Sequence, residues 1–186
     1  MVSALRWLRI TPNQVTITGT VLNLAAAVLV AMDHLIYAAI VFLVAGCFDM
    51  LDGALARLAQ KTTRFGAFLD STLDRVSEGV VFAAVGYLLA SEGRSIDVPL
   101  VVLALLGSIL VSYTRARAEA LGVECKVGLM SRPERVILIA IGLFFDVLPY
   151  VIYIMLALTV FTVVQRVVHT YRQLRKQREQ GGFVER

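Results

Sequence analysis

Long apolar segments follow one another along most of the chain, separated by short polar or charged segments. A helix that crosses the hydrocarbon core of a bilayer needs about 20 mostly apolar residues. With their flanking residues, the apolar segments predict six such helices. The segments are 16–32, 35–47 with its continuation into the next motif, 65–90, 98–113, 136–145 and 147–164. The pattern therefore predicts an all-α integral membrane protein with six transmembrane helices.

The fifth segment is short, and its separation from the sixth depends on Asp146 and Pro149, which interrupt the apolar sequence as a turn does. Ahead of the first segment, residues 1–10 alternate basic with bulky apolar residues, which favours a short helix in the membrane interface. Residues 173–186 are polar and charged. We therefore expect one membrane domain over residues 1–172, followed by a polar cytoplasmic tail.

Basic residues gather in alternate connections between the predicted helices. They lie at 6–9, 57–64, 115–135 and 166–186, whereas the opposite connections contain only Arg94. By the positive-inside rule, both termini and the connections after the second and fourth helices are cytoplasmic. A hydrophobic content of 58% and a mean hydropathy of +0.76 agree with a multi-pass protein of the cell membrane. We attribute the formal net charge of +4 to this topology and to anionic lipid, not to nucleic acid.

Four aspartates stand in this apolar sequence at helical spacings. Asp49 and Asp52 are three residues apart and Asp70 and Asp74 four apart, so each pair lies on one face of its own helix. Each carboxylate inside a membrane costs roughly 2.5–3.5 kcal/mol. Protonation or a bound cation would offset that cost. Carboxylate oxygens suit Mg²⁺ or Mn²⁺, and a pair of such ions suits phosphoryl chemistry, so we expect the chemistry here, near the cytoplasmic helix ends.

The residues around this acidic layer have two interpretations each. Gly53 and Gly66 allow either close approach of a ligand or tight helix packing. Asn13 and Thr16, at the start of the first helix, are either capping residues or ligands. Glu78 continues the stripe of Asp70 and Asp74, either beside the site or in contact with it.

Three arginines are candidates for a second anionic site. Arg115 and Arg135 flank the basic connection after the fourth helix, and Arg166 lies near the cytoplasmic end of the last helix. Single arginines at such places commonly anchor topology. If the three converge on one cavity, they form a site for a phosphate group.

The acidic stretch matches a known signature without a gap or substitution. It reads Asp49-x2-Asp52-Gly53-x2-Ala56-Arg57-x8-Gly66-x3-Asp70-x3-Asp74. This motif resembles that of the CDP-alcohol phosphotransferase family, and segments 11–16, 112–119 and 132–135 also look like family segments. The last two look most like those of phosphatidylinositol phosphate synthases. The resemblance covers nearly the whole chain.

The resemblance implies a role for each group of residues. Two divalent ions, Mg²⁺ or alternatively Mn²⁺, would be held by Asp49, Asp52, Asp70 and Asp74. Asp74 would also be the general base. The CDP-lipid would contact Asn13, Gln14, Val15, Thr16, Gly53, Ala56, Arg57, Thr63 and Gly66. Arg115, Arg135 and Arg166 would bind the phosphate of the acceptor. A homodimer is implied by the resemblance alone.

The expected activity is transfer of the phosphatidyl group of CDP-diacylglycerol, or a related CDP-lipid, to a hydroxyl of myo-inositol phosphate, with release of CMP. Two alternatives use the same mechanism: synthesis of phosphatidylglycerol phosphate, and synthesis of archaetidylinositol phosphate from an ether lipid. A distant alternative is a cation transporter, for which an acidic membrane cluster is typical. Arg57 beside the cluster and the lack of paired broken helices in the sequence pattern argue against transport.

Overall fold

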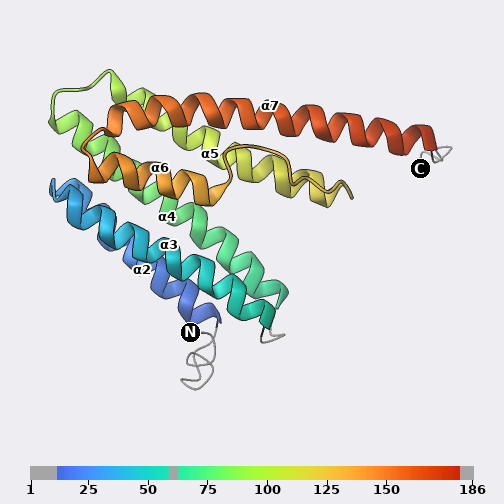
Figure 1. The fold of residues 1–186 in the computed structure, drawn as a ribbon, viewed down its shortest axis with the longest axis horizontal. Coiled ribbons are helices and arrows are strands. Elements are labelled where there is room, and N and C mark those ends of the chain that lie inside the picture. The colour runs from blue at the N-terminus through green and yellow to red at the C-terminus, as the bar shows by residue number, and fades with distance from the viewer. Residues whose placement is uncertain (1–11, 59–62, 181–186) are drawn as a thin grey trace.

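The computed structural model describes residues 12–58 and 63–180, with backbone only for residues 12, 50–58 and 180. In this part of the chain six α-helices follow one another (Figure 1). They are α2 (Pro12–Ala31), α3 (Leu35–Leu58), α4 (Arg64–Ser91), α5 (Asp97–Ala120), α6 (Arg132–Phe144) and α7 (Leu148–Gln180). The predicted all-α architecture and its six helices are confirmed, whereas the predicted interfacial helix at residues 1–10 lies outside the described residues.

Short turns join the helices in pairs. Asp33 follows α2 with φ 61°, and Asp146 follows α6 with φ 54°, so both residues adopt the left-handed conformation that aspartate tolerates in a turn. The predicted break at Asp146 is therefore confirmed, and Pro149 lies in the first turn of α7. The turn between α4 and α5 contains Gly93, with φ 78°.

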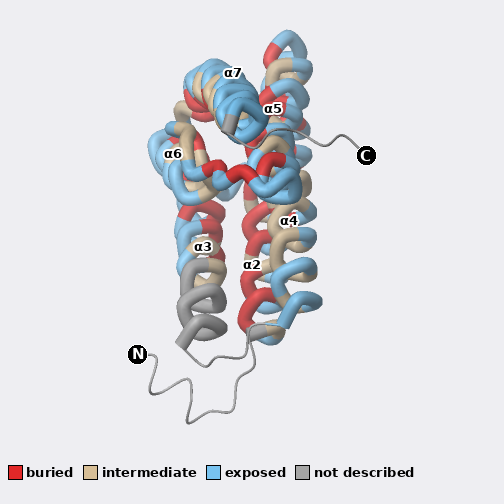
Figure 2. The backbone as a smooth tube through the Cα atoms, turned by 90° about the vertical axis from the view of Figure 1, so that its right-hand side faces the viewer, coloured by how far each residue is buried: buried red, intermediate tan, exposed pale blue. Residues whose placement is uncertain are grey.

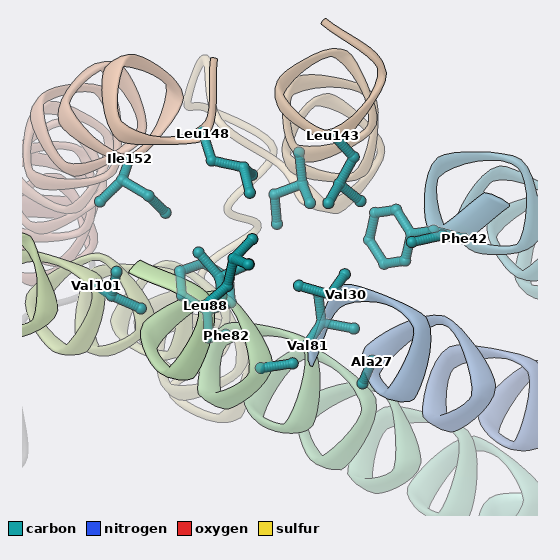
Figure 3. Packing of buried hydrophobic residues seen from close by; sticks show 14 of the residues in the cluster. Ala27, Val30, Phe42, Val81, Phe82, Leu88, Val101, Leu143, Leu148 and Ile152 are labelled. Atoms are coloured by element: carbon teal, nitrogen blue, oxygen red, sulfur yellow. The ribbon is translucent and has the colours of Figure 1, made fainter. Parts of the chain in front are cut away.

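These three turns lie at one end of the molecule, and the helices diverge from there toward the other end (Figure 1). α2 packs between α3 and α4, α5 packs on α4 and α7, and α6 packs against α3 and α7. The buried apolar side chains gather near the turns, where Val30, Phe42, Phe82, Leu143 and Ile152 point toward one another from five helices (Figure 3). The turn end is thus a packed apolar core.

Buried positions lie where helices face one another (Figure 2), and many large apolar side chains are exposed on the outside. Ile17, Val21 and Val28 on α2 are each at least half exposed, as are Val102 and Phe161 on α5 and α7. Large apolar side chains on an outer surface suit contact with lipid chains. The chain is therefore a membrane protein in its surface chemistry as well as its composition.

Three helices in the described part of the chain are long and apolar enough to cross a membrane. They lie within Asn13–Ala31, Asp97–Ala120 and Leu148–Glu179. In α3 the uninterrupted apolar part, Leu35–Asp49, is shorter, and α4 carries charged residues in its first half. The 13 residues of α6 extend about 20 Å, less than a hydrocarbon core of about 30 Å. The start of α6 contacts Asp49 of α3 and Asp74 of α4, and the candidate site lies there.

Candidate active site

A polar cavity of about 450 Å³ opens among α4, α5, α6 and α7, at the end of the bundle away from the turns. Five arginines and four acidic residues contribute to its wall. The complete lining is Asp70, Ser71, Asp74, Arg75, Glu78, Val111, Ser112, Arg115, Ala116, Glu119, Ser131, Arg132, Arg135 and Arg166. A cavity with this lining accommodates a small, highly polar, anionic ligand beside carboxylates.

Carboxylates from two helices meet at one edge of this cavity. Asp49 Oδ2 on α3 and Asp74 Oδ1 on α4 each lie 2.9 Å from the same atom, Nη2 of Arg132. Their side chains are 7% and 19% exposed. The two acidic helices are thus brought together at the divergent end, and Asp70 lines the cavity one turn before Asp74.

The structure leaves part of the predicted acidic set undescribed. Asp52 lies on α3 one turn after Asp49, but its side chain lies outside the described residues, as do those of Gly53, Ala56 and Arg57. Among the side chains that are described, no three acidic, histidine or cysteine residues form a group that could hold a metal ion.

The donor chemistry nevertheless fits a divalent cation. Two carboxylate oxygens from separate helices converge on a single cationic nitrogen, so the pocket between Asp49 and Asp74 already accommodates positive charge. Carboxylate oxygens are the ligands that Mg²⁺ and Mn²⁺ prefer. Asp49, Asp70 and Asp74 are therefore the described residues suited to hold such an ion, and Asp52, whose side chain is not described, stays a prediction.

The backbone of α2 passes very close to Asp49. A Cβ atom built on Gly19 would lie 2.5 Å from Asp49 Oδ1, well inside van der Waals contact. Glycine at position 19 therefore lets α2 pack beside the carboxylate. The sequence analysis missed this residue, because only the pairing of α2 with α3 shows what Gly19 faces.

Residues predicted to contact a CDP-lipid lie where α2 and α4 begin. Thr63 caps α4, its hydroxyl accepting a hydrogen bond from the Gly66 N–H at 2.9 Å. A Cβ on Gly66 would lie 2.9 Å from Thr63 Oγ1 and 3.2 Å from Asn13 Oδ1, so the starts of the two helices touch there. On α2, Gln14 is exposed, whereas Val15 and Thr16 are buried.

The three predicted arginines all line the cavity, each from a different helix. Arg135 on α6 is 2% exposed, and its Nε and Nη2 donate to Glu78 Oε1 and Oε2 at 2.7 and 3.2 Å. Arg166 on α7 is 3% exposed and donates to the backbone carbonyls of Val127 and Val111. On α5, Arg115 is half exposed, and its Nε donates to Glu119 Oε1 at 2.9 Å.

The connection between α5 and α6 is fastened to α7 beside Arg166. Gly128 has φ 123°, and a Cβ on it would lie 2.5 Å from Thr162 Cγ2 and 3.2 Å from Arg166 Nε. The Met130 N–H donates to Thr162 Oγ1 at 3.1 Å. This packing positions both Arg166 and the start of α6 at the cavity.

Two charged residues of the site, Arg132 and Glu78, were not assigned a role from sequence. Arg132 and Arg135 are three residues apart on α6, and they pair with Asp74 and Glu78, four apart on α4. Glu78 had two interpretations, and the structure places it at the cavity wall, where it holds Arg135. The matched spacings are visible in the sequence, but nothing in the sequence shows that these two helices face each other.

Comparison with known proteins identifies relatives in sequence and in fold. A family model described as CDP-alcohol phosphatidyltransferase matches residues 9–165. The chain is 37% identical over 169 residues to an archaetidylinositol phosphate synthase of Methanothermobacter thermautotrophicus, covering 88% of this chain and 84% of the relative.

Two crystal structures of a phosphatidylinositol phosphate synthase of Mycobacterium tuberculosis share the fold. One has CDP-DAG bound, with a TM-score of 0.82, 36% identity and coverage of 91% of both chains. The other is a complex with manganese and citrate, with the same TM-score and identity and coverage of 91% of this chain and 87% of that one.

Proposed function

Because the chain belongs to the CDP-alcohol phosphatidyltransferase family, we propose that this membrane enzyme transfers the phosphatidyl group of CDP-diacylglycerol to a hydroxyl of myo-inositol phosphate. The products are a phosphatidylinositol phosphate and CMP. The observation that carries the proposal is the convergence of Arg115, Arg135 and Arg166 on a cavity that Asp70 and Asp74 also line.

The acceptor's phosphate binds among the three arginines. Guanidinium groups recognise phosphate through charge-assisted, often bidentate hydrogen bonds. Glu78 and Glu119 pair with Arg135 and Arg115, whereas Arg166 donates to backbone carbonyls. A neutral acceptor such as serine or free inositol would therefore leave the buried charge of Arg166 without an anionic ligand, at an electrostatic cost. A phosphorylated polyol therefore fits the cavity better than a neutral alcohol.

The carboxylates on α3 and α4 serve the phosphoryl transfer itself. Asp49, Asp52, Asp70 and Asp74 hold two divalent ions, Mg²⁺ or Mn²⁺, which when bound neutralise negative charge on the diphosphate and on the leaving CMP. A manganese complex of the structurally similar mycobacterial synthase supports this assignment.

Asp74 acts as the general base, as the family resemblance implies, and it lies on the cavity wall together with Asp70. It accepts the proton of the acceptor hydroxyl as that oxygen bonds to the lipid-side phosphorus. The bond from this phosphorus to the oxygen of CMP breaks, and CMP leaves. The arginines keep the acceptor oriented during the transfer.

The CDP-lipid binds where α2, α3 and α4 meet. Its nucleotide part contacts Asn13 to Thr16, Thr63 and Gly66 together with Gly53, Ala56 and Arg57 of the family motif. The close approach of Asn13 and Thr63 around Gly66 supports this placement, since all belong to one surface region. The exposed apolar faces of the helices accommodate the lipid chains.

All six helices lie in the membrane, where α6, about 20 Å long, extends over only part of the hydrocarbon core, and both termini and the active site are cytoplasmic. The three turns at one end of the bundle support this topology, because between them they carry only Arg94 as a basic residue. The later parts of α5 and α7, which carry Arg115, Arg117 and the basic residues from Arg166 to Arg178, extend toward the other end (Figure 1), as the positive-inside rule requires of a cytoplasmic face. The family also suggests a homodimer.

The identity of the lipid and of the acceptor has two close alternatives. The archaeal relative, an archaetidylinositol phosphate synthase, favours an ether-linked CDP-lipid with the same acceptor. Glycerol phosphate, which gives phosphatidylglycerol phosphate, is an anionic acceptor that the arginine cavity also suits.

Acceptor-dependent CMP release tests the proposal. Purified full-length protein in detergent is supplied with Mg²⁺ and either CDP-diacylglycerol or its ether analogue, and with inositol phosphate, glycerol phosphate, free inositol or serine. We expect release with inositol phosphate and none with the neutral acceptors. Release with glycerol phosphate alone would reassign the product, and release with a neutral acceptor alone would overturn the arginine-site argument.

A further inference from the structure

Arg132, the first residue of α6, connects the two acidic helices through a single nitrogen. Its Nη2 lies 2.9 Å from Asp49 Oδ2 on α3 and 2.9 Å from Asp74 Oδ1 on α4. Its side chain is 28% exposed and belongs to the wall of the polar cavity. A cation supplied by the protein thus lies between two of the proposed metal ligands.

The carboxylate of Asp49 has little freedom to bind two cations at once. Its Oδ1 faces the backbone of α2, since a Cβ on Gly19 would lie 2.5 Å away. Its Oδ2 binds Arg132 Nη2, the atom that also binds Asp74 Oδ1. A divalent ion bridging Asp49 and Asp74 needs the same oxygen at about 2.1 Å.

Two positive charges at the same pair of oxygens repel each other strongly, more so in a partly buried site than in water. The ion carries twice the charge of a guanidinium and approaches the oxygens more closely. An ion that binds Asp49 and Asp74 therefore displaces Arg132 from them.

The neighbouring arginine shows how this exchange stays local. Arg135, one turn further along α6, is 2% exposed and is held by both oxygens of Glu78 and by the Met130 carbonyl. It fastens α6 to α4 independently of Arg132. The side chain of Arg132 can therefore move into the adjoining cavity while the helix stays in place.

We propose that Arg132 and the divalent ion compete for Asp49 and Asp74, so that Arg132 sets the apparent affinity of the enzyme for its metal. The guanidinium holds the two carboxylates together, and the ion releases it into the cavity lined by Arg115, Arg135 and Arg166. This inference rests on the proposed function, which assigns Asp49 and Asp74 as metal ligands.

Direct Mn²⁺ binding tests the competition without any lipid substrate. The dissociation constant of Mn²⁺ is measured by electron paramagnetic resonance on the full-length protein in detergent, at fixed pH and ionic strength. We expect Arg132→Gln to tighten Mn²⁺ binding by about tenfold, in the usual range for coupling between two sites. The increase in melting temperature on adding Mn²⁺ is also expected to be larger in Arg132→Gln than in the unaltered protein.

Arg75→Gln is the matched control, because Arg75 lines the same cavity but donates to the carbonyl of Ser71 on its own helix. It removes the same charge, and we expect a clearly smaller effect on Mn²⁺ binding. Arg132→Lys keeps a charge without the guanidinium and should give an intermediate affinity, which preserves the test if Arg132→Gln does not fold.

The outcomes separate this inference from the proposed function. If the unaltered protein binds Mn²⁺ and Arg132→Gln binds it equally or more weakly, the competition is wrong and the metal assignment stands. If Arg132→Gln and Arg75→Gln tighten Mn²⁺ binding equally, the effect comes from the lost positive charge and not from the contact with Asp49 and Asp74, and the inference is overturned. If the unaltered protein binds no Mn²⁺, the metal assignment itself fails, and this inference fails with it.

Discussion

Arg135 is a buried charge that Glu78 neutralises, and this pairing sets the direction from which a phosphate reaches the guanidinium. Nε and Nη2 donate to the two carboxylate oxygens of Glu78, and Nη1 donates to the Met130 carbonyl. A guanidinium has five N–H donors, so one proton on each terminal nitrogen is left for a ligand. Glu78 is therefore a positioning residue for Arg135.

Removing Glu78 should cost far more stability than removing an exposed acid. Glu78→Ala leaves Arg135 buried without its partner, and we expect the free energy of unfolding to fall by about 3–5 kcal/mol. Glu179→Ala is the control, since the Arg175–Glu179 pair is 66% and 61% exposed and should contribute about 1 kcal/mol or less. Denaturation in detergent measures both variants, and equal losses would contradict the argument.

Asp74→Asn tests the general base, because the amide keeps the shape of the carboxylate but cannot accept the acceptor's proton. We expect CMP release to fall by about 10²–10⁴-fold, with the melting temperature nearly unchanged. Asp146→Asn makes the same chemical change in the turn before α7, where asparagine tolerates the left-handed conformation, and should keep full activity. Full activity of Asp74→Asn would exclude Asp74 as the base.

The sequence alone identifies some residues of the site far better than others. The aspartates stand out because a charge within an apolar helix is costly and demands an explanation. Gly19 and Arg132 do not stand out, because their importance depends on which helix each faces. Glu78 is intermediate, since its place on the stripe of Asp70 and Asp74 is visible but its partner Arg135 is not.

At the level of the helices, α2 and α3 pack so closely at Gly19 that any residue with a Cβ atom would collide with Asp49. This contact places Asp49 Oδ1 against the backbone of α2, while its Oδ2 binds Arg132 of α6. α6 has the complementary role, because its first turn carries both Arg132 and Arg135 to the α4 carboxylates. A helix of 13 residues therefore connects the acidic edge of the cavity with its basic wall.

Gly19→Ala should disturb the site without unfolding the bundle. The new Cβ would lie 2.5 Å from Asp49 Oδ1, and the atom that must move is the end of a side chain, not backbone. We expect weaker Mn²⁺ binding and reduced CMP release at a similar melting temperature. Gly79→Ala is the control, because nothing lies within 4 Å of a Cβ there, so binding should not change. Equal Mn²⁺ binding in the two variants would contradict the packing argument.

The helices themselves were predictable from the sequence, although hydropathy alone does not locate all of their ends. The apolar segments located all six described helices, including the short α6, because Asp146 interrupts the hydrophobic pattern there. α7 continues as a helix to Gln180, well beyond its apolar segment. Side-chain pairs four residues apart, such as Arg175 with Glu179, support a polar helix that hydropathy alone does not detect.

In the whole molecule, helix packing and the charged cavity lie at opposite ends. The three turns and the main apolar core lie at one end, where packing holds the helices together (Figures 1 and 3). At the other end the helices diverge, and the space between them is lined by charged side chains. The packed end holds the helices together, and at the divergent end charged side chains from different helices pair with opposite charges, as Arg132 does with Asp49 and Asp74.

Divalent-ion removal tests the chemistry assigned to the divergent end. Excess chelator should abolish CMP release, because the carboxylates alone add negative charge beside an anionic diphosphate. Mg²⁺ or Mn²⁺ added back should restore the activity, and chelator already saturated with Mg²⁺ should have no effect. Undiminished release in excess chelator would contradict the assignment of Asp49, Asp70 and Asp74 as metal ligands.

The most direct test of the central claim is the steady-state kinetics of Arg115→Ala, because the account requires the cavity to bind the acceptor's phosphate. Arg115 is half exposed, so its loss should leave the fold intact. Loss of a charge-assisted hydrogen bond predicts a KM for inositol phosphate about 10- to 100-fold higher, with the KM for CDP-diacylglycerol nearly unchanged. Arg117→Ala, on the same helix but outside the cavity lining, should match the unaltered protein. Equal changes in both KM values, or no change in either, would contradict a dedicated acceptor-phosphate site.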